Sequence, residues 1–172
     1  MKATVIKVAS MTLAFAAQAG AAFAKSAKRS KGAKGNPTHH ATMAPYPGYD
    51  GLLEMSGEVT VEYVGNEDAL QYMLFSFDLR GVAPDCSKCG IHIHTGTGCD
   101  DPNQPGGHYW KDSLVPDHWT STGGAVYNSN GIGRAKGSFY VTNGFGPAEN
   151  LGHAVVVHTQ DGTRVGCGLL MV

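Results

Sequence analysis

The chain has 172 residues, 24 of them glycine, a length and composition that indicate one globular domain behind a processed N-terminal segment. Its formal net charge of −1 hides an asymmetry, because residues 1–35 hold 7 of the 13 basic residues and no acidic residue, while residues 36–172 hold 6 basic and 14 acidic residues. A domain with this acidic excess is not typical of nucleic-acid-binding proteins.

The first 24 residues have the features of a secretory signal peptide. The segment begins with two lysines, continues as an uncharged run of small and apolar residues over 8–24, and ends in the small-x-small motif Ala-Phe-Ala. The run is rich in alanine and short for a bilayer span of about 20 strongly apolar residues, and no other segment is apolar enough to cross a membrane. We therefore expect residues 1–24 to be removed and the protein to be secreted, to the extracellular space or a periplasm.

Residues 25–50 are rich in Lys, Ser, Gly, Ala and Pro and predict a basic disordered linker. The lysines of Lys25–Lys34 form either a solvated tail or a contact with an anionic surface, such as a wall polysaccharide or lipid headgroups. The pair His39-His40 could catch metal adventitiously, but we do not assign it to the main site.

Residues 51–172 predict one all-β domain, in which short β-rich segments alternate with turns of glycine, asparagine and aspartate. The predicted strands are Met55–Val64, Leu70–Arg80, Gly90–Thr95, Ala125–Tyr127, Ala135–Thr142, His153–Thr159 and Val165–Val172. Short strands at this spacing favour a β-sandwich or β-barrel. The segment Cys99–Gly124 has no strand pattern, and a loop of this length is usually functional.

Residues 90–96, with the sequence Gly-Ile-His-Ile-His-Thr-Gly, carry the most specific chemical signal. On a strand, His92 and His94 lie on one face, and the two isoleucines lie on the other. Two further histidines follow, His108 in the predicted loop and His158 near the end of a predicted strand. Neutral imidazoles suit copper, zinc, iron and nickel, so these four histidines predict a transition-metal site.

Four cysteines in an exported chain predict disulfides before free thiols. They are Cys86, Cys89, Cys99 and Cys167, and by themselves they leave three pairings open. The Cys-Ser-Lys-Cys motif at 86–89 could be a redox or metal motif. We interpret it as a local staple before the histidine strand, because a zinc ribbon needs a second Cys-x-x-Cys motif and the sequence has none.

Together these segments resemble the copper/zinc superoxide dismutase family over about residues 55–172. Residues 90–94 are similar to the family's copper-binding strand, and residues 106–109 to the loop segment whose histidine bridges two metals. Residues 152–158 are similar to the strand with the last copper histidine. Residues 164–168 are similar to the C-terminal segment with the active-site arginine and a disulfide cysteine.

The resemblance implies a copper-binding β-sandwich or barrel of Greek-key topology. The implied copper ligands are His92, His94, His108 and His158. The implied catalytic residues are Arg164, which would position the superoxide anion with its forked donors, and His108. Cys99 lies where the family has the partner of Cys167, which implies a Cys99–Cys167 disulfide and leaves Cys86–Cys89 as the second. The expected function is a secreted copper-dependent superoxide dismutase that converts superoxide to dioxygen and hydrogen peroxide.

Two departures from the family pattern concern zinc and the loop before the arginine. The family's zinc site adds two histidines and an aspartate to the bridging histidine, whereas this loop offers Asp112, Asp117 and His118 at a different spacing. Only five residues separate His158 from Arg164, where the family has a long charged loop. Both departures resemble the copper-only branch, so we expect copper without zinc. A retained zinc site would require His118 and Asp117 to bind the ion with water.

Three other functions share part of this pattern. A secreted copper buffer or carrier would keep the histidines without needing Arg164 or an open coordination position. A structural β-sandwich that has lost its metal would not keep the full histidine set. A zinc hydrolase built on the His-x-His pair would need a general base beside the site, and the sequence shows none.

Overall fold

The computed structural model describes residues 35–65, 71–112, 116–121 and 123–172. In chain order its elements are β1 (Thr38–Pro45), β2 (Ser56–Val64), β3 (Tyr72–Arg80), β4 (Cys89–Ile93), α1 (His118–Ser121), β5 (Val126–Tyr127), β6 (Arg134–Val141), α2 (Pro147–Asn150), β7 (Ala154–His158) and β8 (Arg164–Leu169). Within these ranges no helix combines the length and apolarity that a membrane crossing requires.

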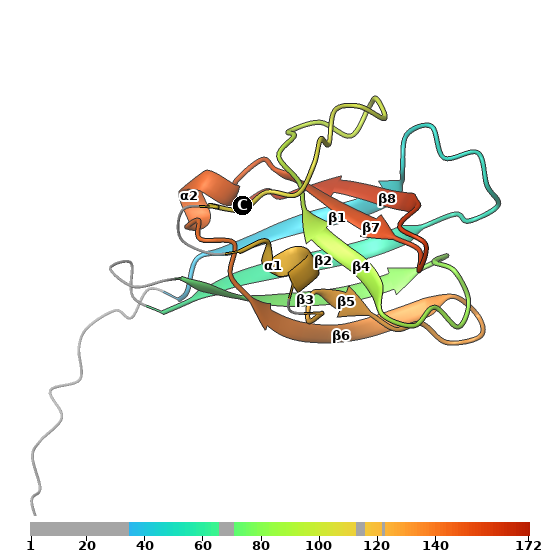
Figure 1. Ribbon diagram of the computed structural model, residues 1–172, viewed down its shortest axis with the longest axis horizontal. Helices are drawn as coiled ribbons and strands as arrows, with labels where there is room; N and C mark the ends of the chain where they lie inside the picture. Colours follow the sequence, from blue (N-terminus) through green and yellow to red (C-terminus); the bar gives the residue numbers. More distant parts are fainter. Residues whose placement is uncertain (1–34, 66–70, 113–115, 122) are drawn as a thin grey trace, which may run out of the picture. The chain divides into compact units, whose positions relative to one another are not determined.

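The strands form one sheet that curls into a nearly closed barrel (Figure 1). Its order is β5-β4-β7-β8-β1-β2-β3-β6, and neighbouring strands are antiparallel throughout the described part. The chain therefore crosses the barrel between β3 and β4 and between β6 and β7, while β5 and β6 are the two end strands that face each other at the seam. The predicted all-β Greek-key fold is confirmed, and each of the seven predicted strands is present with slightly shifted ends.

Alternating apolar side chains build the interior of the barrel. On β2, Val59, Val61 and Tyr63 are buried, and the residues between them face outward. On β3, every second residue from Met73 to Leu79 is buried. Full burial of an aliphatic or aromatic side chain contributes about 1.5–3 kcal/mol, so this alternation fixes which face of each strand turns inward.

The predicted linker over residues 25–50 is wrong for its second half, because β1 lies inside it. This strand pairs with β2 along its length and with β8 at its end, and it buries His39, Ala41 and Met43 on one face. Its small and polar residues carry little local strand signal, and its partners lie far along the chain. The β domain therefore begins before residue 51. The predicted signal peptide, residues 1–24, and the cluster Lys25–Lys34 lie outside the described residues.

Candidate metal centre

Two neighbouring strands supply three of the predicted histidines. His92 lies on β4, His94 follows directly after it, and His158 ends β7. The two strands are antiparallel, with His92 opposite Val156. His108 comes from the long loop after β4, and it forms an isolated antiparallel β-bridge with His94. The described part of that loop contains no named strand, as the sequence predicts, and it also contains the short helix α1, which was not predicted.

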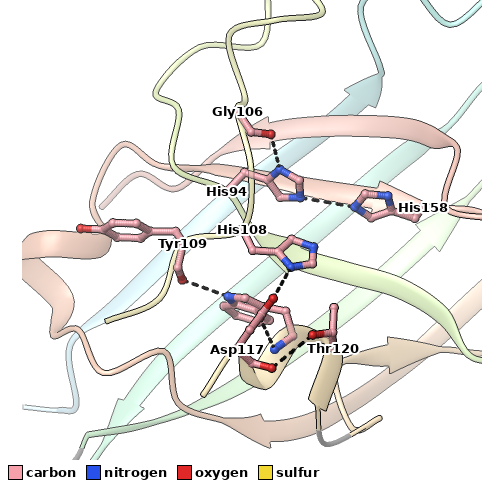
Figure 2. Close-up of polar contacts among 8 residues, drawn as sticks. His94, Gly106, His108, Tyr109, Asp117, Thr120 and His158 are labelled. Carbon is pink, nitrogen blue, oxygen red and sulfur yellow. Dashed lines mark hydrogen bonds and ion pairs between the residues drawn. The ribbon is translucent and has the colours of Figure 1, made fainter. Parts of the chain in front are cut away.

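The four imidazoles converge on one point, and Figure 2 shows three of them, His94, His108 and His158. One ligand nitrogen from each histidine lies within 4.8 Å of the other three, and the Nε2 atoms of His94 and His158 are 3.3 Å apart. The rings of His92 and His108 meet edge to face, with centroids 4.5 Å apart. Nitrogens bound to one ion at about 2.0–2.1 Å lie roughly 3–4 Å from each other, so this spacing fits a single transition-metal ion.

Three of the rings are held from outside the cluster through Nδ1. His94 donates to the Gly106 carbonyl at 2.9 Å, and His158 donates to the Gly162 carbonyl at 3.0 Å. His108 donates to a carboxylate oxygen of Asp117 at 2.9 Å. Because carbonyl and carboxylate oxygens only accept, these contacts assign the proton to Nδ1 and leave the Nε2 lone pair to the cluster. Such outer partners orient metal-binding imidazoles.

His92 differs, because its Nδ1 is buried and has no hydrogen-bond partner among the described residues. A buried polar atom without a partner is costly, and a native structure that keeps one needs a reason. A metal ion would provide the missing partner. Gly90 makes room for the ring, since a Cβ atom at this position would lie 2.5 Å from Cε1 of His92. The donor set and this orphaned nitrogen therefore fit a bound metal ion.

Burial favours the neutral form of three histidines of the cluster. Desolvation, reinforced by the neighbouring histidines, lowers the pKa of His92 to about 2, and desolvation lowers the pKa of His94 to about 3. Burial also lowers the pKa of His158. Neutral imidazole is the form that binds metal, so these three ligands do not have to lose a proton before the site loads at neutral pH.

Arg164 lies at the edge of the cluster, at the start of β8 and opposite His158 in the strand pairing. Its Nη2 donates to the Gly106 carbonyl at 2.7 Å, and its Nη1 donates to the Tyr46 hydroxyl at 2.9 Å. The Gly106 carbonyl thus holds both the guanidinium and the His94 ring. Gly106 has φ +69°, a conformation that glycine adopts without strain and that directs its carbonyl to both groups.

An open pocket leads from the surface to the cluster. Its lining includes His94, His108, His158, Trp110, Asp117 and Arg164. A second opening is lined by His92, His108 and His158. Its lining also includes Trp119, whose buried indole ring lies 5.9 Å from the His92 ring. A small anion could therefore reach the cluster from the side on which Arg164 supplies a permanent positive charge.

The residues considered for zinc do not join the group of four. Asp117 hydrogen-bonds with one oxygen to His108 and with the other to the Trp119 backbone N–H, which places it at the start of α1. His118 begins that helix, and Asp112 is exposed. Among the described residues, one group of three or more metal-ligating side chains has the spacing that an ion requires.

Sequence reasoning missed the role of Tyr46. The residue falls inside the predicted linker, and its contact with Arg164 spans 118 positions of the chain. The tyrosine is buried, and its hydroxyl donates to the Pro102 carbonyl at 2.6 Å. No local motif marks such a residue, because only the pairing of β1 with β8 brings it to the site.

Two disulfides frame the centre. Cys99 pairs with Cys167 across 68 positions, and Cys86 pairs with Cys89. This is the pairing that the family resemblance and the local motif imply. The long bridge ties the loop that carries His108 to β8, which carries Arg164. Two disulfides also agree with an oxidising, extracellular type of compartment.

Comparison with known proteins gives a structural likeness and no sequence match. No family model and no curated protein matches the chain. Among solved structures, a mutant of Candida albicans superoxide dismutase 5 is similar over 80% of this chain and 90% of its own, with a TM-score of 0.53 and 16% identity. A second mutant of the same Candida protein is similar over 80% and 92%, with a TM-score of 0.52 and 16% identity. At this identity the likeness establishes the fold.

Proposed function

We propose that this protein is a secreted copper-dependent superoxide dismutase that works with copper alone. The observation that carries the proposal is the convergence of four imidazoles beside Arg164, in a barrel similar to that of a superoxide dismutase. A non-catalytic copper site would need the imidazoles but not a fixed guanidinium at the mouth of the pocket.

The ligand chemistry favours copper. The group contains imidazoles and no carboxylate or thiolate, and copper(II) accepts tetragonal nitrogen ligation at the top of the affinity series of divalent metals. Zinc has no redox chemistry and could not support electron transfer. The His108 nitrogen that faces away from the cluster lies 2.9 Å from Asp117, so a second metal on that nitrogen would have to displace this hydrogen bond. That contact supports the copper-only form of the proposal.

The chemistry that copper supplies there is one-electron transfer: one superoxide loses an electron and leaves as dioxygen, and a second gains an electron and two protons and leaves as hydrogen peroxide. His92, His94, His108 and His158 would hold the ion. Arg164 would bind the anion through the N–H groups that its contacts with Tyr46 and Gly106 leave over. Asp117 holds the His108 proton on Nδ1 and so fixes the direction of that ring.

Metal analysis and a superoxide assay on one purified sample test the proposal. The secreted mature protein is reconstituted with copper, zinc or both, its metal content is measured, and superoxide decay is followed by pulse radiolysis. We expect one copper per chain, little zinc, and turnover in the copper-loaded protein alone. His158→Ala should lose copper, whereas His40→Ala, on the exposed face of β1, should keep it.

Each alternative has its own outcome in this experiment. Stoichiometric copper without turnover would identify a copper buffer or carrier. Zinc bound beside copper, with Asp117 or His118 in its coordination shell, would overturn the copper-only form. Secretion is tested separately, because N-terminal sequencing of the mature protein should begin at Lys25. Binding of this protein to anionic polysaccharide or vesicles, compared with a variant without Lys25–Lys34, tests the proposed surface contact.

A further inference from the structure

Tyr46 occupies a junction of three segments beside the metal centre. It directly follows β1, and its backbone N–H donates to the Val165 carbonyl of β8 at 3.0 Å. Its side chain is 7% exposed and packs with Cys167 and Val156 in a small cluster apart from the main core. Its hydroxyl bonds Pro102, in the loop that leads to His108. Tyr46 therefore connects the end of strand β1 with strand β8 through its backbone and with the loop through its hydroxyl.

The direction of each hydrogen bond at this phenol is fixed by chemistry. A guanidinium can only donate, so the Tyr46 oxygen accepts from Nη1 of Arg164 at 2.9 Å. A carbonyl can only accept, so the hydroxyl proton goes to Pro102 at 2.6 Å. The Tyr46 ring also lies 5.7 Å from Cζ of Arg164, within reach of a cation–π contact. No rotation of the hydroxyl satisfies both neighbours in another way.

We infer that Tyr46 is a positioning residue for Arg164, holding the guanidinium at the angle at which its remaining N–H groups can bind an anion beside the cluster. The identity of the anion rests on the proposed function, whereas the contact by which Tyr46 holds Arg164 does not. Arginine has five N–H donors, and the contacts with Tyr46 and Gly106 use two of them. A side chain fixed at two points loses less entropy when it binds a ligand than one that swings freely.

A purely structural role for Tyr46 would come from the packing of its ring, whereas the positioning role comes from its hydroxyl. Removing the hydroxyl alone therefore distinguishes the two roles. Tyr46→Phe keeps the ring in the small cluster and removes the acceptor for Arg164. Tyr49→Phe is the matched control, because Tyr49 packs against the same cluster and no contact between its hydroxyl and Arg164 appears in the described residues. Both variants lose one phenol oxygen, but only Tyr46→Phe loses the hydrogen bond with Arg164.

The first readout needs no metal. In the metal-free protein, nitrogen-15 relaxation of arginine Nε–H groups reports the rigidity of each guanidinium, and the chain has four arginines, Arg29, Arg80, Arg134 and Arg164. Arg164→Lys assigns the signal by removing it. We expect the Arg164 order parameter to fall below about 0.6, the flexible range, in Tyr46→Phe and to stay high in Tyr49→Phe. An unchanged order parameter in Tyr46→Phe would overturn the inference.

The second readout is anion affinity of the copper-loaded protein, with azide as the probe and its visible charge-transfer band as the signal. We expect the azide Kd to rise about 3- to 10-fold in Tyr46→Phe, the range of one hydrogen bond, while copper content stays at the wild-type level. Tyr46→Phe added to Arg164→Lys should weaken azide no further, because both changes act on one contact. Full additivity in this cycle would show that Tyr46 acts independently of Arg164.

The two proposals fail in different places. If the wild-type protein binds no copper or turns over no superoxide, the proposed function fails, and the order parameter still decides whether Tyr46 holds Arg164. If the wild-type protein is active and Tyr46→Phe matches it in both order parameter and azide affinity, the positioning role fails and the proposed function stands.

Discussion

His108 Nδ1 lies 2.9 Å from a carboxylate oxygen of Asp117, and both side chains are about one-fifth exposed, at 20% and 22%. The other Asp117 oxygen accepts the Trp119 backbone N–H at 3.0 Å, so the first turn of α1 orients the carboxylate. Within the described cluster, His108 alone has a side chain as its Nδ1 partner, since His94 and His158 use backbone carbonyls. A substitution can therefore remove this partner without altering the backbone.

Asp117→Asn should weaken copper binding. An asparagine amide can turn its NH2 group toward His108 and favour the wrong tautomer, in which Nε2 carries the proton and cannot bind metal. Loss of an outer-shell partner of a metal-binding histidine usually costs about 10- to 100-fold in affinity, and competition against a chelator of known affinity measures it. Asp112→Asn, an exposed change in the same loop, is the control. Equal affinities in the two variants would count against an orienting role for Asp117.

Arg164→Ala should keep copper and lose turnover. The variant removes no ligand nitrogen, but it removes the charged donor at the pocket mouth, and hydrogen bonds to charged groups are worth about 1.5–3 kcal/mol, or roughly 10- to 100-fold in rate. Pulse radiolysis gives the rate, and metal analysis confirms loading. Arg134→Ala, on exposed β6, controls for the loss of positive charge. Equal rates in wild type and Arg164→Ala would return Arg164 to a structural role and favour the copper-buffer alternative.

Breaking the Cys99–Cys167 disulfide should destabilise both the fold and the site. The bridge spans 68 positions, which the chain-entropy model values at about 4 kcal/mol, whereas the Cys86–Cys89 loop is worth about half as much. Paired alanine substitutions followed by urea unfolding compare the two losses. Copper affinity should fall with the long bridge, because it ties the His108 loop to β8, and should largely survive loss of the short one. A larger effect from the short bridge would refute this assignment.

His39 should make the domain less stable in mild acid. Burial first, and the neighbouring His40 second, lower the pKa of His39 from its ordinary value of 6.5, and its Nδ1 lies 3.1 Å from the Tyr63 hydroxyl. Below pH 6.5 the unfolded chain therefore binds protons that the folded protein refuses, so stability is full above this pH and falls as the pH drops.

The matched variant isolates this contribution. Urea unfolding of the metal-free protein is compared with His39→Gln between pH 7.5 and 5, because every other titrating group is shared. The wild type should lose more stability than the variant, with an extra slope of at most about 1.4 kcal/mol per pH unit. Parallel curves for the two proteins would show that His39 does not contribute.

Patterns confined to short stretches of sequence were sufficient to predict most of the barrel. Turn residues marked the ends of the predicted strands, because turn formation depends on neighbouring residues alone. The His-x-His spacing likewise put His92 and His94 on one face of a strand. Strand β1 was missed because its apolar content is low and its stability comes from pairing with β2 and β8.

The sequence by itself determined the chemistry available to this protein, namely the four imidazoles, the arginine and the cysteines. The order of these groups along the chain also carried the family resemblance. Only the tertiary structure decided how those groups are held. It placed Gly106 between His94 and Arg164, Asp117 behind His108, and Tyr46 against Arg164 across 118 positions. Such contacts depend on barrel closure and on the path of a long loop, and no local propensity encodes either of them.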